Sequence, residues 1–352
     1  MAKKARTPER DEAENRLKAD IKNETFQTLY VLCGEEAYMR EHYLARMTEK
    51  LTGGPAGAFN EHRFTAETLS PQALADAIDA MPMMAEKSFI RVDDVDFSRM
   101  AGALCEQYAD VLADIPEYCC VVLVYDTVEY KSGPEKGRLR DVLKKNAFVV
   151  RLEKRNEAHL VQWVYRHVKA AGKDISDELC RYLIFLTDGT MTTLGGEIEK
   201  VVHYCTTPSV SKSDIDAMVT PSLNAQSFDI SDAISQGDYD KALRKLQELF
   251  AMQEEPLKIL GAIGAQLRRV YYARVIAGAG KSQQTLMELT GMKSSYAAGL
   301  AMQSARRVSE QFCMRAVELC FQTDLAMKRS GGDAERLLEL LLAQLAQEAR
   351  RA

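Results

Sequence analysis

Short runs of β-branched, aromatic and other apolar residues recur through the first part of the chain. Each run has a length typical of a strand, and patterns with apolar residues three or four positions apart separate the runs. The run from Cys119 to Tyr125 is apolar almost throughout, as expected for a strand buried on both faces of a sheet. The pattern therefore predicts five strands, over residues 28–34, 61–64, 88–94, 119–126 and 147–153.

Helical patterns fill the intervals between these strands. One of them begins at Ser70-Pro71, an N-cap residue followed by proline at the first helical position. Its apolar face carries Leu74, Ala77, Ile78 and Met81. Strands that alternate with helices form right-handed βαβ units and hence a parallel sheet. We therefore expect an α/β domain over residues 26–155, preceded by a polar N-terminal arm, mobile or loosely helical, over residues 1–25.

After about residue 155 the strand patterns stop, and apolar residues recur at helical spacing. Three helices are predicted first, and a linker rich in Ser, Thr and Pro follows them at residues 206–226. Longer apolar stripes then continue to the end of the chain. We expect a three-helix unit with its linker over residues 156–223 and a helical bundle over residues 224–352, some of whose apolar surface could contact other subunits.

Charge and composition narrow the classes of partner. The chain has 352 residues and a net charge of −5, and from Asn224 onward 17 Lys and Arg stand against 15 Asp and Glu. Neither part has the basic excess of a protein that neutralises many phosphates, so DNA contacts should be local or shared with partners. Lys131, Lys136 and Arg138, in a loop with Gly and Pro, are candidates, although such residues more often form a solvated turn.

Cysteine usage and the absence of long apolar runs indicate a cytoplasmic protein. The eight cysteines form no Cys-x-x-Cys pair, and most lie in apolar runs, which favours buried, reduced thiols. The first 20 residues are charged throughout and lack the apolar core of a signal peptide. No apolar run approaches the roughly 20 residues that span a bilayer, so we expect no membrane partner.

A nucleotide-binding loop would be the expected chemistry of an α/β domain followed by helices. Such a loop needs glycines and backbone N–H groups around the phosphates, plus a Lys and a Ser or Thr, directly after the first strand. Gly34-Glu35-Glu36 stands there instead, and carboxylates at a helix start repel a triphosphate. Gly280-Lys281-Ser282 lacks the glycine five residues earlier, where Val275 stands, and it follows a helix. We interpret it as an interhelical turn.

Acidic residues offer two further candidate sites. Asp126 ends the fourth predicted strand, where an ATPase would hold magnesium, but without a phosphate-binding loop it is better explained as a turn residue. Asp93, Asp94 and Asp96 follow the third strand, and such clusters more often cap a helix than bind a cation. The histidines show no metal-ligand spacing, and no nucleophilic motif is present. We expect no catalytic, cofactor-binding or metal-binding residue.

Three stretches, in this order and spacing, carry a family resemblance. The first runs from TLYVLCGEEAYMREHY to KSFIRVDDVDF, the second from IDAMVTPSLNAQ to QLRRVYYARVI, and the third is TDLAMKRSGGDAERLLELLLAQL. Over about residues 27–345 the chain resembles the delta subunits of bacterial DNA polymerase III. The N-terminal arm lies outside the resemblance.

The resemblance implies both a fold and a function. The fold would be an ATPase-like (AAA+-type) parallel-sheet domain without a phosphate-binding loop, a three-helix lid and an all-α collar. The function would be that of a non-ATPase clamp-loader subunit in DNA replication, within a holoenzyme whose activity is that of a DNA-directed DNA polymerase. The implied partners are the beta sliding clamp, the gamma/tau and delta-prime subunits, and primed DNA through the assembled complex.

The resemblance also implies a clamp-binding element, a pair of large apolar residues before the third strand. Met83 and Met84, in the segment from Met81 to Lys87, stand at those positions, where many relatives carry Leu and Phe. From the residues alone, this segment reads as a loop with a Met-rich core patch, although Met also suits adaptable binding surfaces. Two alternatives to a clamp-loader subunit are an active ATPase or helicase-type motor with a degenerate nucleotide site, and a helical scaffold unrelated to replication.

Overall fold

The computed structural model describes residues 8–53, 57–131, 137–330 and 333–351. The chain divides into two compact units, residues 1–155 and 156–352. The first unit contains all the strands named below, and the second is helical. A further domain boundary at residue 224, inside the second unit, stays a prediction.

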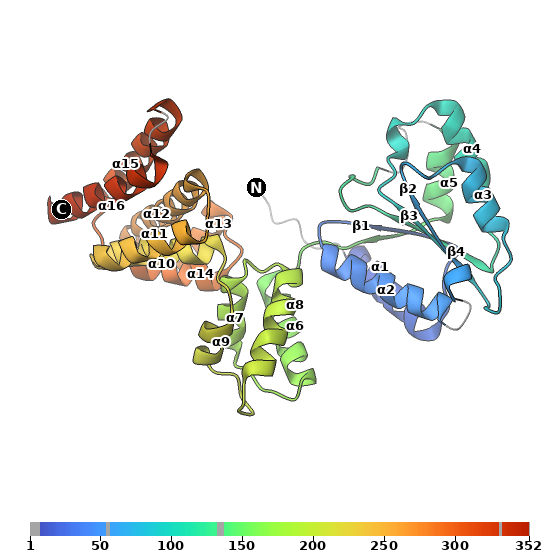
Figure 1. The fold of residues 1–352 in the computed structure, drawn as a ribbon, viewed down its shortest axis with the longest axis horizontal. Helices are drawn as coiled ribbons and strands as arrows, with labels where there is room; N and C mark the ends of the chain where they lie inside the picture. The colour runs from blue at the N-terminus through green and yellow to red at the C-terminus, as the bar shows by residue number, and fades with distance from the viewer. Residues whose placement is uncertain (1–7, 54–56, 132–136, 331–332, 352) are drawn as a thin grey trace. The chain divides into compact units, whose positions relative to one another are not determined.

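A parallel sheet forms the centre of the first unit, as the alternating pattern predicted (Figure 1). The strands are β1 Leu29–Cys33, β2 Glu61–Thr65, β3 Ser88–Asp93, β4 Cys119–Val124 and β5 Phe148–Arg151. Their order in the sheet is β2-β3-β4-β1-β5. Every residue of β1 and β4 is buried. Strands covered on both faces gain no stability from polar side chains, which explains their continuous apolar sequences.

Helices cover both faces of this sheet (Figure 1). On one face lie α1 Pro8–Asn23 and α2 Ala37–Thr52. On the other lie α3 Pro71–Asp79, α4 Gly102–Ala113 and α5 Arg138–Asn146.

The connections after the two central strands run over opposite faces, because β1 leads into α2 and β4 leads into α5. Neighbouring strands with diverging connections form a topological switch point. In open α/β sheets the crevice at the carboxyl ends of such strands is where ligands bind. The carboxyl ends of β1 and β4 are therefore the place to look for a nucleotide site.

α1 corrects the prediction of a polar arm. Leu17 and Ile21 are buried in the same core as Leu44 and Met47 of α2. Only this narrow stripe is apolar, and the remainder of the helix is polar, so its sequence resembles that of a solvated segment. Residues 1–7 lie outside the described residues.

Polar contacts fix α1 as well. The Glu14 carboxylate accepts a hydrogen bond from the Tyr43 hydroxyl at 2.8 Å. It also forms an ion pair with Arg155 at 2.5 Å. Both Glu14 and Arg155 are largely buried. Burial alone raises the pKa of Glu14, but the hydrogen bonds from Arg155, Lys18 and Tyr43 outweigh it and lower the pKa to about 2. The carboxylate is therefore stabilised in its charged form.

The second unit begins with the three predicted helices, α6 Glu157–Ala170, α7 Asp177–Leu186 and α8 Met191–Tyr204. In the expected linker the structure has a further short helix, α9 Lys212–Met218, which begins with a capping box between Ser211 and Asp214 and buries Ile215. A hydrogen bond from the Tyr182 hydroxyl of α7 to the Asp216 carboxylate, at 2.6 Å, connects this segment to the preceding helices. The sequence reads as a linker because α9 has a single buried position.

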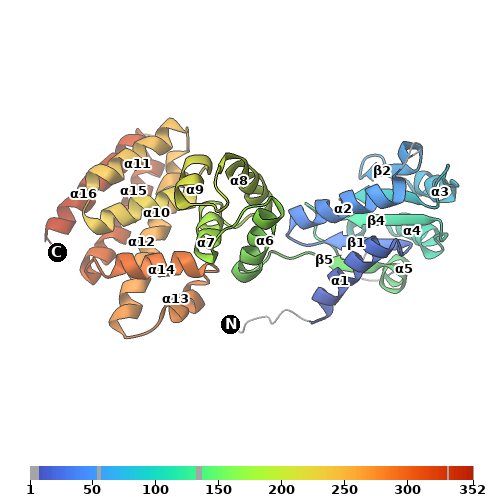
Figure 2. The same ribbon diagram turned by 90° about the horizontal axis from the view of Figure 1, so that it is seen from below.

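Seven helices complete the unit within the described residues (Figure 2). They are α10 Leu223–Gln236, α11 Tyr239–Ala251, α12 Pro256–Gly278, α13 Gln283–Thr290, α14 Ser295–Ala305, α15 Glu310–Ser330 and α16 Ala334–Arg351. α10, α11, α12, α15 and α16 share one apolar core. The C-terminal half of α12 forms a second core with α13, α14 and α15. No helix in the described part of the chain is both long and apolar enough to cross a membrane.

Glu157 joins the early helices of this unit to the later ones. Its carboxylate accepts hydrogen bonds from the Ser294 hydroxyl at 2.8 Å and the Ser295 backbone N–H at 3.0 Å, and it pairs with Arg181. Burial raises the pKa of Glu157, but the hydrogen bonds from Ser294 and Ser295 lower it below its usual range. A carboxylate at the start of α14 is also favoured by the helix dipole.

The buried Glu14 ion pair predicts a pH-dependent contribution to stability. Glu14→Gln removes the charge that Arg155 faces, and hydrogen bonds to charged groups contribute about 1.5–3 kcal/mol. Because the folded pKa of Glu14 lies below its ordinary value of 4.5, this contribution is present above about pH 4.5 and is lost as the pH falls toward 2. Urea unfolding at pH 7 should show the loss, and the difference from wild type should shrink at pH 3.

Glu12→Gln provides the matched control, because Glu12 lies on the same helix and is exposed. It should leave the free energy of unfolding within about 0.5 kcal/mol of wild type. Equal effects of the two substitutions, or a Glu14→Gln effect that does not change with pH, would contradict this account of α1.

Candidate functional site

The crevice at the switch point is occupied by a side chain of the protein itself. Arg40 of α2 is only 1% exposed. One guanidinium nitrogen donates to the Gly34 carbonyl at 2.8 Å, and another forms an ion pair with Asp126, just beyond the end of β4. Arg40 thus joins the carboxyl ends of β1 and β4, where a nucleotide would otherwise lie.

The loop after β1 is built for this internal contact. Gly34 has φ +115, and a Cβ there would lie 2.2 Å from the Leu152 carbonyl oxygen, so only glycine fits. The Glu36 N–H donates to the same carbonyl oxygen at 2.9 Å. Glu36 itself is buried, and burial raises its pKa. Gly34 turns its carbonyl toward Arg40, whereas a phosphate-binding loop turns backbone N–H groups toward the ligand.

The acidic residues after β3 are likewise engaged within the fold. The Asp94 carboxylate accepts from the backbone N–H groups of Asp126, Thr127 and Val128, at 2.7 to 3.3 Å. Although Asp94 is partly desolvated, these hydrogen bonds lower its pKa. Asp93 pairs with Arg63 and Arg91, both at 2.6 Å. Asp94 therefore closes the turn after β4, and Asp93 is an ion-pair partner of arginines on β2 and β3.

Two further sequence candidates have structural explanations. Asp96 caps the short helix Phe97–Arg99 by accepting from the Ser98 N–H at 3.0 Å. Gly280-Lys281-Ser282 lies between α12 and α13, with Gly280 at φ +67 and the Lys281 N–H bonded to the Ile276 carbonyl. This is the hydrogen-bond pattern of a helix C-terminus. The interpretation of this triplet as an interhelical turn is confirmed.

Sequence reasoning missed Arg40. Its position was readable, because the buried face of α2 carries Tyr43, Leu44, Met47 and Leu51, and helical spacing places residue 40 on that face. A charged residue on a buried stripe needs a partner. Asp126 lies 86 residues later in the chain, and no local pattern could have named it.

The opposite, amino-terminal edge of the sheet carries an exposed apolar loop, residues 80–87, which we call the wedge loop. Met81 is 77%, Met83 53% and Met84 94% exposed. A core position for these methionines is therefore wrong, and α3 ends at Asp79 instead of continuing to Met81. Pro82 explains the early end, because the residue before a proline disfavours helical geometry.

Phe59 adds to this surface. It is 69% exposed and directly precedes Asn60, whose side chain is hydrogen-bonded to Met83. Among the described residues of the first unit, the large apolar side chains that stand out as exposed are Phe59, Met81, Met83 and Met84. Their gathering at one edge of the sheet makes this edge the candidate binding surface of the first unit, since large exposed apolar clusters are uncommon on soluble domains.

The candidate DNA contacts lie elsewhere. Lys131 is exposed and near Glu129, at 3.8 Å, and Arg138 forms an ion pair with Asp110 at the start of α5. Lys136 lies outside the described residues. The two described side chains thus have acidic neighbours, which favours a solvated turn over a site prepared for phosphate.

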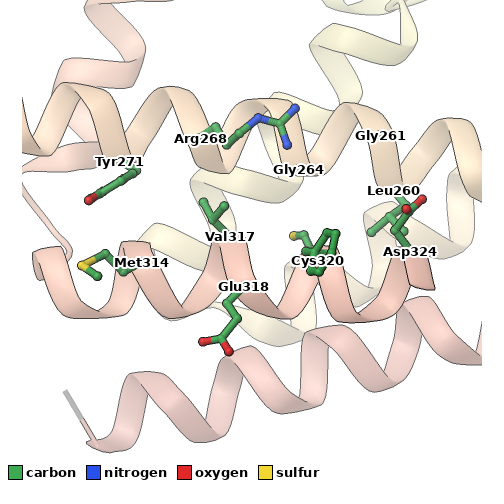
Figure 3. A pocket seen from close by; sticks show the side chains of 11 residues that line it. Leu260, Gly261, Gly264, Arg268, Tyr271, Met314, Val317, Glu318, Cys320 and Asp324 are labelled. Atoms are coloured by element: carbon green, nitrogen blue, oxygen red, sulfur yellow. The ribbon is translucent and has the colours of Figure 1, made fainter. Parts of the chain in front are cut away.

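A second apolar surface lies between α12 and α15 (Figure 3). Arg268 and Tyr271 of α12 stand opposite Met314 and Val317 of α15 in this view. Gly261 and Gly264 leave part of the groove floor without side chains. The groove also includes Met314 and Phe321, which are 55% and 61% exposed.

Known proteins resemble the chain over nearly its whole length. Residues 224–345 match the family model of the DNA polymerase III delta subunit, C-terminal domain. The DNA polymerase III subunit delta of Bacillus subtilis is 24% identical over 335 residues, covering 92% of this chain and 94% of the relative. The chain is thus similar to DNA polymerase III delta subunits, and residues 224–345 match their C-terminal domain.

Two further likenesses agree with this assignment. A probable DNA polymerase III subunit delta of Aquifex aeolicus is 23% identical over 278 residues, covering 77% of each chain. The solved structure of the Bacillus subtilis DNA clamp loader delta protein superposes with a TM-score of 0.57 at 22% identity, covering 95% of this chain and 99% of that one. The predicted fold, a parallel-sheet domain followed by helices, is thereby confirmed. These likenesses favour the resemblance to delta subunits over a scaffold unrelated to replication.

Proposed function

We propose that this chain is a non-catalytic subunit of the DNA polymerase III clamp loader. In this role it binds the beta sliding clamp through Met83 and Met84 and holds one interface of the ring open for loading onto primed DNA. The observation that carries the proposal is the exposure of this methionine pair on the wedge loop, in a chain similar to delta subunits over most of its length. Its partners would be the gamma/tau and delta-prime subunits, in the cytoplasm.

The side-chain properties of the two methionines suit a transient apolar interface. Their side chains are unbranched and polarisable, so they adapt to a pocket of varied shape. Buried on binding, each could contribute about 1.5–3 kcal/mol. A subunit can hold a ring open only by binding the open ring more tightly than the closed one. Apolar side chains that enter a newly opened interface would supply that difference.

The alternative, an active ATPase or helicase-type motor, meets a physical obstacle at the switch point. A phosphate group would have to displace the Asp126 carboxylate from Arg40 and approach the buried Glu36. It would also find the Gly34 carbonyl directed into the crevice. Each of these contacts opposes an anion, so we infer that the chain has no nucleotide site and contributes to polymerase activity only within the assembled holoenzyme.

Nucleotide binding is the direct test of this inference. The isolated chain should show no saturable binding of a fluorescent ATP analogue up to about 1 mM, the upper end of usual substrate affinities. Equilibrium titration measures this, with an ATPase of known affinity measured in parallel. Micromolar affinity that disappears on Lys281→Ala would show that the triplet at residues 280–282 binds phosphate after all.

Clamp binding should depend on the methionine pair. Replacing Met83 and Met84 by Ala should weaken binding about 10²- to 10⁴-fold, since two buried side chains are lost and about 1.4 kcal/mol is tenfold. The melting temperature should not fall, because both side chains are exposed in the free protein. Titration calorimetry with purified clamp, beside a thermal melt, measures both quantities.

Met252→Ala is the matched control, since Met252 is 50% exposed and lies in the second unit. It should leave clamp affinity unchanged. Clamp affinity that survives the double substitution, or a double variant that melts at a lower temperature, would argue against the wedge.

The collar, residues 224–352, is proposed to bind neighbouring loader subunits, and the α12–α15 groove is the surface that fits such a contact best. Phe321→Asp places a charge on a 61% exposed position of this groove. It should abolish co-elution with gamma/tau and delta-prime on size exclusion while the helical circular dichroism signal stays that of wild type. Burying an unpaired carboxylate at an interface is strongly unfavourable.

Leu289→Asp serves as the control for assembly, because Leu289 is 71% exposed on α13 and does not line the groove. Assembly should survive this change. If both variants assemble normally, the subunit contacts lie on another face of the collar.

A further inference from the structure

Asn60 occupies an unusual place beside the wedge loop. It lies between the short helix Gly57–Phe59 and β2, and only 2% of it is exposed. Its side-chain oxygen accepts from the Met83 N–H at 2.6 Å, and its side-chain nitrogen donates to the Met83 carbonyl at 2.8 Å. One amide group therefore pairs with both backbone polar groups of a single residue, as a neighbouring strand would.

The backbone of Asn60 is fixed in turn. Its N–H donates to the Gly57 carbonyl at 3.0 Å, and its carbonyl accepts from the Phe89 N–H of β3 at 2.8 Å. Asn60 thus connects the wedge loop to the sheet, since its backbone is bonded to β3 and its side chain to Met83. At the far end of the loop, Lys87 donates to the Glu117 carbonyl at 2.7 Å. The loop is held at its middle and its end while its apolar side chains face solvent.

The conformation held at this point is one that a loop would not adopt by itself. Met84, next to the residue that Asn60 binds, has φ +53. This left-handed region is disfavoured for a side chain with a Cβ, and it persists only where surrounding contacts impose it. It also leaves the Met84 side chain 94% exposed.

We infer that Asn60 is a positioning residue that holds the Met83–Met84 pair in its binding conformation before the clamp arrives. This inference rests on the proposed clamp-binding function and adds how the site is prepared. A loop ordered in advance loses less conformational entropy on association, so affinity rises without any new contact. Asn60 itself is buried and would not touch the clamp.

Asn60→Ala tests the inference by two measurements. Hydrogen exchange of the Met83 backbone amide in the free protein should accelerate about tenfold or more, since its acceptor is removed. Clamp affinity should fall about tenfold, the effect expected when a loop must be ordered on binding. Asn60→Asp keeps the shape and the acceptor but turns an oxygen toward the Met83 carbonyl, so it should also weaken binding and serves if Asn60→Ala does not fold.

Asn146→Ala is the matched control. The Asn146 side chain also donates to a backbone carbonyl in the first unit, that of Ala113 at 2.9 Å, which lies outside the wedge loop. It should leave both measurements unchanged. The variant with Asn60, Met83 and Met84 all replaced by Ala separates positioning from general stability. Because Asn60 acts through the methionines, this variant should bind no more weakly than the variant lacking the methionines alone.

Two results would overturn the inference: an unchanged exchange rate at Met83 in Asn60→Ala, or additive losses of affinity in the triple variant. Absence of clamp binding by the wild-type protein would instead reject the proposed function. In that case the exchange rate at Met83 still decides whether Asn60 holds the loop.

Discussion

The first unit depends on the contacts of the buried Arg40 guanidinium with Asp126 and Gly34. Bringing this cation out of water is unfavourable unless it is paired, and the Asp126 carboxylate together with the Gly34 carbonyl provides the compensation. The requirement constrains the glycine at residue 34, the helix that begins at Ala37 and the carboxyl end of β4. The crevice at the carboxyl ends of the central strands is thus filled by a side chain of the protein itself.

The parallel sheet gives its two edges different chemistry. At the carboxyl edge, polar groups meet one another in ion pairs and turn hydrogen bonds. At the amino edge, Asn60 is buried and Met83 and Met84 are exposed, so polarity lies inside and apolar surface outside. Binding at the amino edge therefore leaves the sheet and the Arg40 contact undisturbed. Under the proposed function, the clamp-binding surface is separate from the crevice that Arg40 fills.

The strands were predictable from sequence because their burial is local information. A continuous apolar run such as Cys119–Val124 states directly that both faces are covered. The packing of α1 was not predictable, because Glu14 pairs with Arg155, which lies 141 residues later in the chain. A helix with so few apolar residues also resembles a solvated arm. The end of α3 was readable in principle from Pro82, but the apolar spacing of Met81 outweighed it in the prediction.

The candidate site divides in the same way. The resemblance to delta subunits directed attention to Met83 and Met84, and the structure shows them exposed. Composition and spacing alone favoured a core patch, because a methionine at helical spacing is usually buried. The hydrogen bonds between Asn60 and Met83 join residues 23 positions apart. Like the Arg40–Asp126 pair, they depend on tertiary proximity that no local sequence pattern shows. Short-range sequence patterns therefore predict the helices and strands, whereas the polar contacts between distant residues are seen only in the folded structure.

Site-specific photo-cross-linking tests the central claim most directly. A photoreactive amino acid in place of Met84, in the full chain mixed with purified sliding clamp, should form a covalent adduct with the clamp. The same residue in place of Met252, which is also exposed but lies in the second unit, should not. An adduct from position 252 with none from position 84, under conditions where the two proteins co-elute, would contradict the assignment of the wedge loop as the clamp-binding surface.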